Sequence, residues 1–160
     1  MNKTLLLSAA AMMSASVAVA DPWNGVYVGM SLGSNSWTHP SNTPVTEVNT
    51  LLSVGYNAQI GSMVVGVEAH YGDVAYSDTS TDTRSGTAFR AGYLLTPGTL
   101  GYATIGNSDY VADTKYEFVG FGAEFAAFGS ATADIEYREY SNAVTNWSGS
   151  EISLGLNWHF

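Results

Sequence analysis

The sequence has 160 residues and is acidic, with 14 Asp and Glu against 5 Lys and Arg, and it contains no cysteine. This charge balance excludes nucleic-acid binding, because too few basic side chains are present to neutralise a run of phosphates. The lack of cysteine excludes disulfide bonds, thiol catalysis and cysteine-ligated metal sites. Stability must therefore come from elsewhere, and a closed ladder of strand hydrogen bonds is one such source.

The first twenty residues have the features of a cleaved export signal. Lys3 supplies a short positive region, residues 5–13 form an apolar run, and Ala18–Ala20 provides a small-residue cleavage site. The run is too short to span a bilayer by itself. We therefore expect residues 1–20 to be removed and residues 21–160 to form one domain. Loss of Lys3 would change the formal net charge from −9 to −10.

Beyond the signal, apolar residues recur at every second position, which is the periodicity of a β-strand. The last segment shows it best, because Ile152, Leu154 and Leu156 alternate with small, polar or charged residues. The faces of the second and fifth segments stay open. Each segment is near the ~9–11 residues with which a tilted strand crosses a membrane. The segments lie at 25–33, 48–58, 63–72, 87–95, 100–107, 116–125, 133–138 and 151–160.

The connections between these segments alternate in length, as in bacterial outer-membrane barrels. We expect polar loops at one end and tight turns at the other. An even number of strands places both termini at the tight-turn end, which would face the periplasm. The loops are expected at 34–47, 73–85, 108–115 and 141–148, and the turns at 59–62, 96–99 and 126–130.

The two faces of the segments indicate which way the sheet is turned. One face carries Val, Ile, Leu and aromatic residues, whereas the other is crowded with Gly, Ser and charged residues. A small, polar face suits a narrow barrel interior, so the apolar face is expected to meet lipid. Lipid forbids open sheet edges, so the sheet must close. The sequence therefore predicts an all-β, eight-stranded antiparallel up-and-down transmembrane barrel; a soluble lipocalin-like barrel would need the reverse arrangement.

Several motifs resemble the OmpA-like and opacity-protein-like family of small outer-membrane barrels. The resemblance covers essentially all of residues 21–160 and implies a place in the outer membrane of a Gram-negative bacterium. It also implies that Leu156, Trp158 and Phe160 form the terminal signal recognised by the barrel-assembly machinery. OmpA itself continues into a peptidoglycan-binding domain, so a cell-wall tether is not expected here. The motifs are Trp23–Gly29, Gly66–Glu68, Gly120–Phe125, Asp134–Arg138 and Leu156–Phe160.

Charged side chains on the polar face are expected to pair inside the barrel. Eight strands leave a lumen just wide enough for side chains, which favours a structural plug over an ion or proton path. We expect Glu68 to pair with Arg90. Arg138 is expected to pair near Glu136, or with Glu124 or Glu151. The predicted lumen network is Glu68, His70, Arg90, Glu124, Glu136, Arg138 and Glu151.

Aromatic residues near the tight-turn ends fit a girdle at the membrane interface. Those in the expected loops are interpreted as interfacial or as contacts to a partner. The girdle residues are Trp23, Tyr56, Tyr93, Phe125, Trp158 and Phe160, and the loop residues are Trp37, Tyr76, Tyr110 and Trp147.

Three functions stay open. We favour a non-enzymatic protein that contributes to envelope integrity or surface interaction; a narrow pore and a lipid A-modifying enzyme are the alternatives. The enzyme is considered because His39 and Ser41 stand in a string that resembles a lipid A deacylase motif, but their place in a loop beside Pro40 argues against catalysis.

No metal or cofactor is expected, because His70 and His159 lack a third ligand at metal spacing and the acidic loops lack calcium-loop order. The expected partners are outer-membrane lipid and lipopolysaccharide, together with the assembly machinery and periplasmic chaperones during biogenesis. We expect a monomer.

Overall fold

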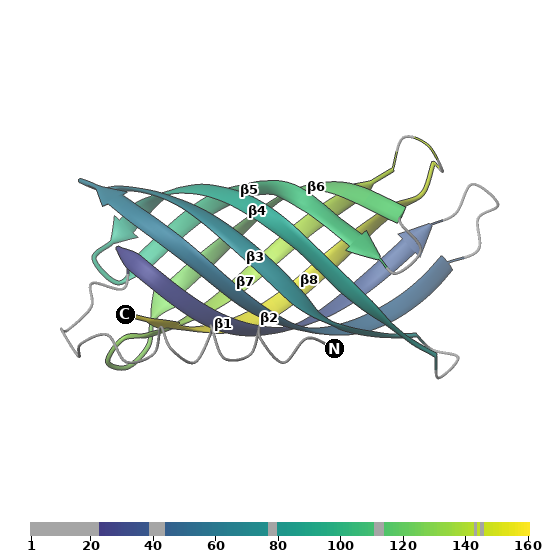
Figure 1. The fold of residues 1–160 in the computed structure, drawn as a ribbon. Helices are drawn as coiled ribbons and strands as arrows, with labels where there is room; N and C mark the ends of the chain where they lie inside the picture. Colours follow the sequence, from purple (N-terminus) through teal and green to yellow (C-terminus); the bar gives the residue numbers. More distant parts are fainter. Residues whose placement is uncertain (1–22, 39–43, 77–79, 111–113, 143, 145) are drawn as a thin grey trace.

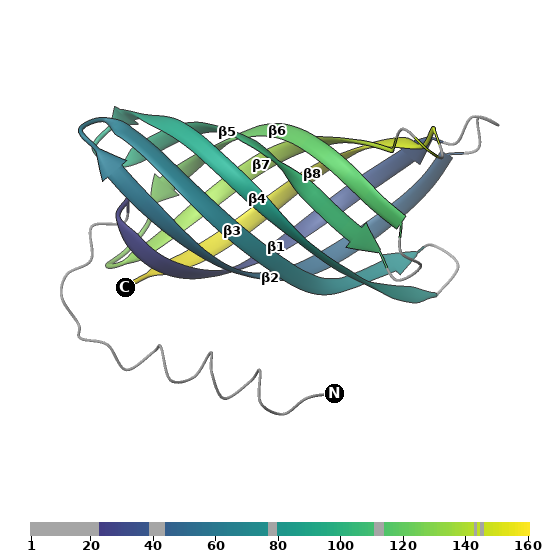
Figure 2. The same cartoon turned by 45° about the horizontal axis from the view of Figure 1, so that its top comes forward.

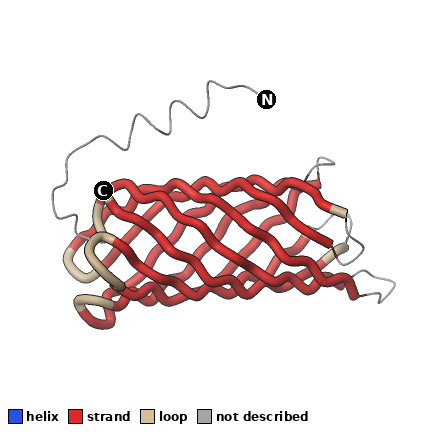
Figure 3. Tube along the Cα trace, turned by 90° about the horizontal axis from the view of Figure 1, so that it is seen from below, coloured by secondary structure: helices blue, strands red, loops and turns tan. Residues whose placement is uncertain are grey.

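The computed structural model describes residues 23–38, 44–76, 80–110, 114–142, 144 and 146–160. Its strands form a closed antiparallel barrel in which each strand pairs with its neighbours in sequence and β8 closes on β1 (Figures 1 and 2). They run obliquely around the barrel and make up nearly all of the described trace (Figure 3). The strands are β1 Gly25–Thr38, β2 Pro44–Ile60, β3 Met63–Tyr76, β4 Thr81–Thr96, β5 Thr99–Tyr110, β6 Thr114–Ala126, β7 Ala131–Ser141 and β8 Ser148–His159.

No helix in these described ranges is long and apolar enough to cross a membrane.

The strands extend further than the sequence predicts. The β1–β2 ladder, for example, continues to the pair Thr38↔Pro44. The loops expected at 34–47, 73–85 and 108–115 are therefore wrong in extent, because most of their residues belong to strands, whereas of the loop expected at 141–148 only Ser141 and Ser148 do. Polar residues replace the apolar ones on the outside of these segments, so the apolar alternation stops while the backbone ladder continues.

The core of this barrel is polar and its outside is apolar. On β8, buried Glu151 and Ser153 alternate with exposed Ile152 and Leu154. The two segments with an open face follow the same rule, since Leu52 of β2 and Ile105 of β5 point outward. This arrangement is the reverse of a soluble barrel.

The outward apolar side chains form a continuous belt, here called the apolar band. Beyond it, towards the longer connections, the outer wall becomes polar: Ser34 and Ser36 follow on β1, and Asn107 and Asp109 on β5. The tight turns and the C-terminus lie together at the opposite end (Figure 1). The band comprises the outward residues of 26–32, 52–56, 63–71, 89–95, 101–105, 119–125, 133–137 and 152–158.

Candidate functional site

A fully buried arginine, Arg84, organises the half of the lumen nearest the longer connections. Its Nη1 lies 2.5 Å from Glu151 Oε2, and its Nε donates to Ser108 Oγ at 3.2 Å. Its Nη2 donates to the Tyr140 hydroxyl, which in turn donates to Glu151 at 3.1 Å. A guanidinium is tolerated in such a place only because every side of it meets an acceptor.

Arg84 was not among the predicted lumen residues, because residues 73–85 were expected to be a loop. One signal could have revealed it, because alternate residues of a strand share a face. Extending the strand alternation outward from Arg90 through Ala88 and Gly86 places Arg84 on the same face as Arg90.

In the middle of the lumen, charges gather around Glu68. Its carboxylate accepts a hydrogen bond from the Tyr27 hydroxyl at 2.8 Å. Arg138 Nη2 lies 3.7 Å away and His70 Nδ1 lies 3.8 Å away. Arg138 also donates through Nε to Glu136, so of its three expected partners it contacts Glu136.

The half nearest the tight turns is centred on Glu124. This carboxylate pairs with Arg90 and accepts a hydrogen bond from the Thr132 hydroxyl. Asn157 Nδ2 donates to it at 3.2 Å, and His159 Nε2 lies 3.4 Å away. Four side chains from three other strands thus surround one buried carboxylate, which is the condition for keeping such a group inside.

The predicted pair Glu68–Arg90 is wrong, because Arg90 reaches Glu124 instead. The residue opposite Arg90 on β3 is Gly66, and the guanidinium extends past β5 to β6. A narrow lumen allows such pairs between strands that are not neighbours, and distance from a turn carries no information about them. All seven residues of the predicted lumen network nevertheless point inward.

Two apolar clusters close the ends of this polar interior. The outer aromatic cluster, at the end of the longer connections, includes ring pairs such as Trp37–Tyr116, with centroids 4.8 Å apart. The inner cluster fills the tight-turn end. The outer aromatic cluster is Trp37, Val74, Ala88, Tyr110, Phe118 and Tyr140, flanked by Val45, Tyr76, Tyr116 and Trp147; the inner cluster is Trp23, Val64, Leu100 and Tyr102, flanked by Leu94.

The prediction that Trp23 belongs to the interfacial girdle is wrong. Its side chain is only 2% exposed and its indole N–H donates to the Pro97 carbonyl at 3.0 Å. Trp23 precedes β1, so strand parity could not place it. The outward girdle residues are Tyr56, Tyr93, Phe125 and Trp158, and Phe160 is half-buried.

Between the clusters remains a cavity of about 30 Å³, room for no more than a few water molecules. In the described part of the chain, no three His, Asp or Glu side chains are grouped as a metal site. The cavity is lined by Glu68, His70, Arg90, Asp134, Glu136 and Arg138, among others.

The whole range from residue 5 to residue 160 matches the family model of the outer membrane protein beta-barrel domain. The chain belongs to this family. The recognition and the fold predicted from the sequence are confirmed, and the apolar band of this outer-membrane barrel therefore marks its membrane-spanning segments.

Solved structures share the fold. Neisserial surface protein A is 16% identical, with a TM-score of 0.58 over 85% of this chain and 97% of that chain. Ail, the attachment invasion locus protein of Yersinia pestis, is 10% identical, with a TM-score of 0.61 over 86% and 99%. A de novo designed transmembrane β-barrel is 16% identical, with a TM-score of 0.56 over 86% and 96%. Among curated protein sequences, none matches this chain.

Glu47 lies at the outer mouth of the barrel, beyond the apolar band. The residue is only 5% exposed, and its Oε2 has no hydrogen-bond partner among the described residues. Burial raises the pKa of Glu47 to about 7, against smaller opposing effects of the Trp37 indole and of Arg84. Glu47 was not among the predicted site residues, because residues 34–47 were expected to be a loop.

The interior also brings together a serine, a histidine and an acid. Ser108 Oγ lies 3.1 Å from His70 Nε2, and His70 Nδ1 lies 3.8 Å from Glu68. Ser108 is fully buried and already accepts a hydrogen bond from Arg84, so a substrate has no access to it. The other candidate pair, His39 and Ser41, lies outside the described residues.

Proposed function

We propose that this chain is a non-enzymatic, non-conducting protein of the Gram-negative outer membrane that acts through the surface at the end of its longer connections. The observation that carries this is the filled lumen: three linked groups of charges lie between two apolar clusters. A continuous water path would have to displace buried ion pairs, and leaving one charge of such a pair unpaired costs about 3–5 kcal/mol.

The proposed orientation places the tight turns and both termini in the periplasm. Outer-membrane barrels generally have short periplasmic turns and longer external connections. The two shortest connections between the strands, 61–62 and 97–98, lie at this end, although the connection 127–130 at the same end is longer. Lipid and lipopolysaccharide would then surround the apolar band. Two barrels of the same fold are described as a surface protein and as an attachment invasion locus protein, which fits a role at the cell surface.

We also propose that Leu156, Trp158 and Phe160 form the signal for the barrel-assembly machinery. Leu156 and Trp158 point outward on β8, and the Phe160 N–H donates to the Val26 carbonyl at 2.9 Å. The segment is thus part of the β1–β8 closure of the barrel.

The decisive experiment is conductance in planar bilayers. Protein whose unboiled form shifts on a gel, and which is therefore folded, is expected to give no steady single-channel current. The double variant Trp37→Ala/Tyr110→Ala removes two rings of the outer aromatic cluster but leaves the ion pairs and the inner cluster, so it is expected to give no steady current either. Steady current steps from the wild type would overturn the proposal in favour of a narrow pore.

Enzymatic activity is tested separately on lipid A. Expression in a host is expected to leave the acyl chains of lipid A intact, as judged by mass spectrometry. Loss of an acyl chain with the wild type, but not with Ser41→Ala, would establish the enzyme instead.

A further inference from the structure

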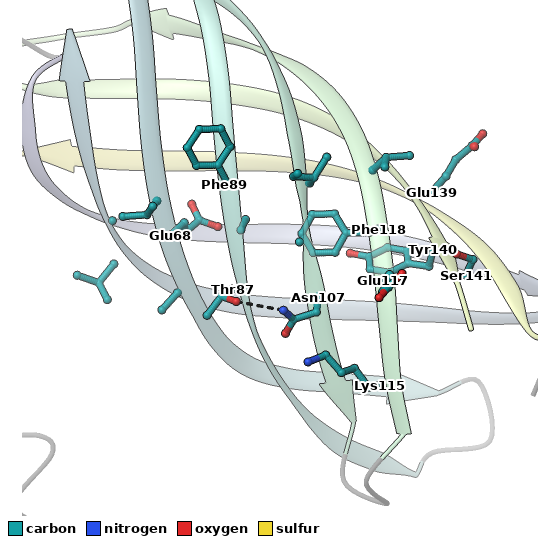
Figure 4. Close-up of a pocket in the computed structure, with 18 of the residues that line it drawn as sticks. Glu68, Thr87, Phe89, Asn107, Lys115, Glu117, Phe118, Glu139, Tyr140 and Ser141 are labelled. Atoms are coloured by element: carbon teal, nitrogen blue, oxygen red, sulfur yellow. Dashed lines mark hydrogen bonds between the residues drawn. The ribbon is translucent and has the colours of Figure 1, made fainter. Parts of the chain in front are cut away.

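A furrow crosses the outer wall of the barrel (Figure 4). Its sides are two rows of outward side chains, because residues that oppose each other in the ladders line up across the strands. Its floor is the backbone of the row between them, whose side chains, such as Ala88 and Phe118, point inward. One side of the furrow runs Val54, Ala69, Thr87, Asn107, Glu117 and Ser141.

The furrow changes from apolar to polar along its length. The other row shows the same change, from Val67 through Phe89 to Glu139. Strands of such barrels are tilted by about 45°, so a row that crosses them rises from the middle of the membrane to its surface. The furrow therefore fits an elongated molecule with an apolar tail and a polar head. Because it is continuous with the apolar band, the molecule that reaches it is a lipid.

The polar end offers one cation. Lys115 lines the furrow and is exposed, and it makes no ion pair with a described acid. The arginines Arg84, Arg90 and Arg138 all point inward, so Lys115 is the single outward base of the described residues. Beside it, Asn107 Nδ2 donates to Thr87 Oγ1 at 3.2 Å and keeps its second N–H for a ligand.

We propose that this furrow binds lipopolysaccharide, with an acyl chain along Ala69 and Phe89 and a lipid A phosphate at Lys115. The choice of lipid rests on the orientation in the proposed function, which places the polar end in the outer leaflet. Glu117 and Glu139 also line that end and would repel a phosphate. Binding therefore requires a divalent cation between these carboxylates and the phosphate.

The test measures binding of purified lipopolysaccharide to the detergent-folded barrel by native mass spectrometry, with Mg²⁺ or with EDTA. Wild-type binding is expected to fall in EDTA. Lys115→Gln is expected to weaken binding about two- to fivefold, the range of an exposed ion pair. The double variant Glu117→Gln/Glu139→Gln is expected to depend less on Mg²⁺ than the wild type, because two carboxylates of the furrow are gone while Asp109, opposite Lys115, remains. Asp73→Asn, an outward acid outside the furrow, keeps the Mg²⁺ requirement.

The apolar end of the furrow is tested by placing a large side chain in it. Ala69→Trp is expected to weaken binding about tenfold, since the ring would occupy the path of the acyl chain. Ala91→Trp, the same change on the apolar band outside the furrow, is the matched control. The inference would be overturned if Ala69→Trp and Ala91→Trp bound lipopolysaccharide equally well. It would also be overturned if the wild type bound phosphatidylethanolamine more tightly than lipopolysaccharide. Gel mobility and planar-bilayer conductance are measured on the same samples. A loss of lipopolysaccharide binding can then be distinguished from a failure of the proposed function.

Discussion

The two ends of the lumen are closed in different ways. At the tight-turn end, the apolar residues stand beside a carboxylate, Glu124, that four side chains surround, and the Trp23 indole is bonded to a turn carbonyl. At the outer end, the closure is a stack of rings around Trp37, and Glu47 lies among them without an arginine in contact. Directional bonds are present in both halves, but at the inner end they extend to a turn carbonyl, whereas at the outer end they include Tyr140 and the rings around Trp37 are held by packing.

This difference matches the proposed surroundings of the two ends. The inner end contains the C-terminal seam and the turns, which have to be in register for the barrel to close. The outer end supports the connections that would face the exterior. We therefore expect the inner end to resist local change and the outer end to respond to pH and to repacking.

The largest effects are expected from removing the buried arginines. Arg84→Met and Arg90→Met should each lower the free energy of unfolding by about 3–5 kcal/mol, because a buried carboxylate loses its cation. Arg84→Met should cost more, since Glu124 keeps three donors whereas Glu151 keeps only Tyr140 and Asn49.

These values are measured by urea unfolding in lipid vesicles, with the folded fraction read from gel mobility. Lys115→Met, which removes an exposed cation, is the control and should change stability by less than about 0.5 kcal/mol. A loss below about 1 kcal/mol for both arginine variants would mean that the ion pairs do not hold the lumen closed.

Two glycines distinguish bonded from packed rings. A Cβ at Gly55 would strike the Tyr27 ring, and one at Gly149 would strike Trp37. Tyr27 is bonded to Glu68 and cannot shift, whereas the Trp37 N–H has no hydrogen-bond partner in the described ranges. Gly55→Ala should therefore cost about 2–3 kcal/mol and Gly149→Ala about 1 kcal/mol.

The same urea assay checks this difference. At Gly98 an added Cβ would meet Ala126 at an ordinary 3.8 Å, so Gly98→Ala should be neutral or slightly stabilising and controls for glycine removal itself. Equal costs for Gly55→Ala and Gly149→Ala would contradict the view that the outer ring can yield.

The sequence was sufficient for the parts of the molecule that period-two alternation encodes. Alternation placed Glu68, Glu124 and Arg138 inside, and it turned Leu154 outward, because neighbouring strand residues must face opposite ways. It also located every strand. Alternation could not choose partners across the lumen, so the pair Glu68–Arg90 was wrong.

Where the outer wall becomes polar, the contrast between faces disappears although the strands continue. This is why Arg84, Glu47 and Trp37 were expected in loops, and why Glu151 was the predicted residue at the outer end of the candidate site while its partner Arg84 was missed. The ladder in that region is maintained by backbone bonds, which leave no mark in the side-chain pattern.

The pH dependence of stability should come from the outer end. The folded pKa of Glu47 is about 7, above its ordinary value of 4.5, so the folded state keeps a proton that the unfolded state releases. The contribution of Glu47 to stability is therefore full below about pH 4.5 and is lost as the pH rises to about 7. Glu47→Gln should match the wild type at pH 4 and be about 1–2 kcal/mol more stable at pH 8.

Urea midpoints from pH 4 to pH 8 give the difference curve between the two proteins. Glu117→Gln removes an outward carboxylate and separates a general effect of net charge from that of Glu47. A constant difference across the range would show that Glu47 is not desolvated in the folded barrel.

The smallest effect compares the two buried tryptophans. Trp23→Phe and Trp37→Phe remove the same volume, but Trp23→Phe also leaves the Pro97 carbonyl without its indole donor. The loss of that bond should make Trp23→Phe about 1 kcal/mol more costly. The comparison is made at pH 5, where Glu47 is protonated and the Trp37 indole no longer faces a charge. Equal costs at pH 5 would show that the Trp23 bond adds no stability, and any additional cost of Trp37→Phe at pH 8 measures how strongly the outer indole stabilises the Glu47 carboxylate.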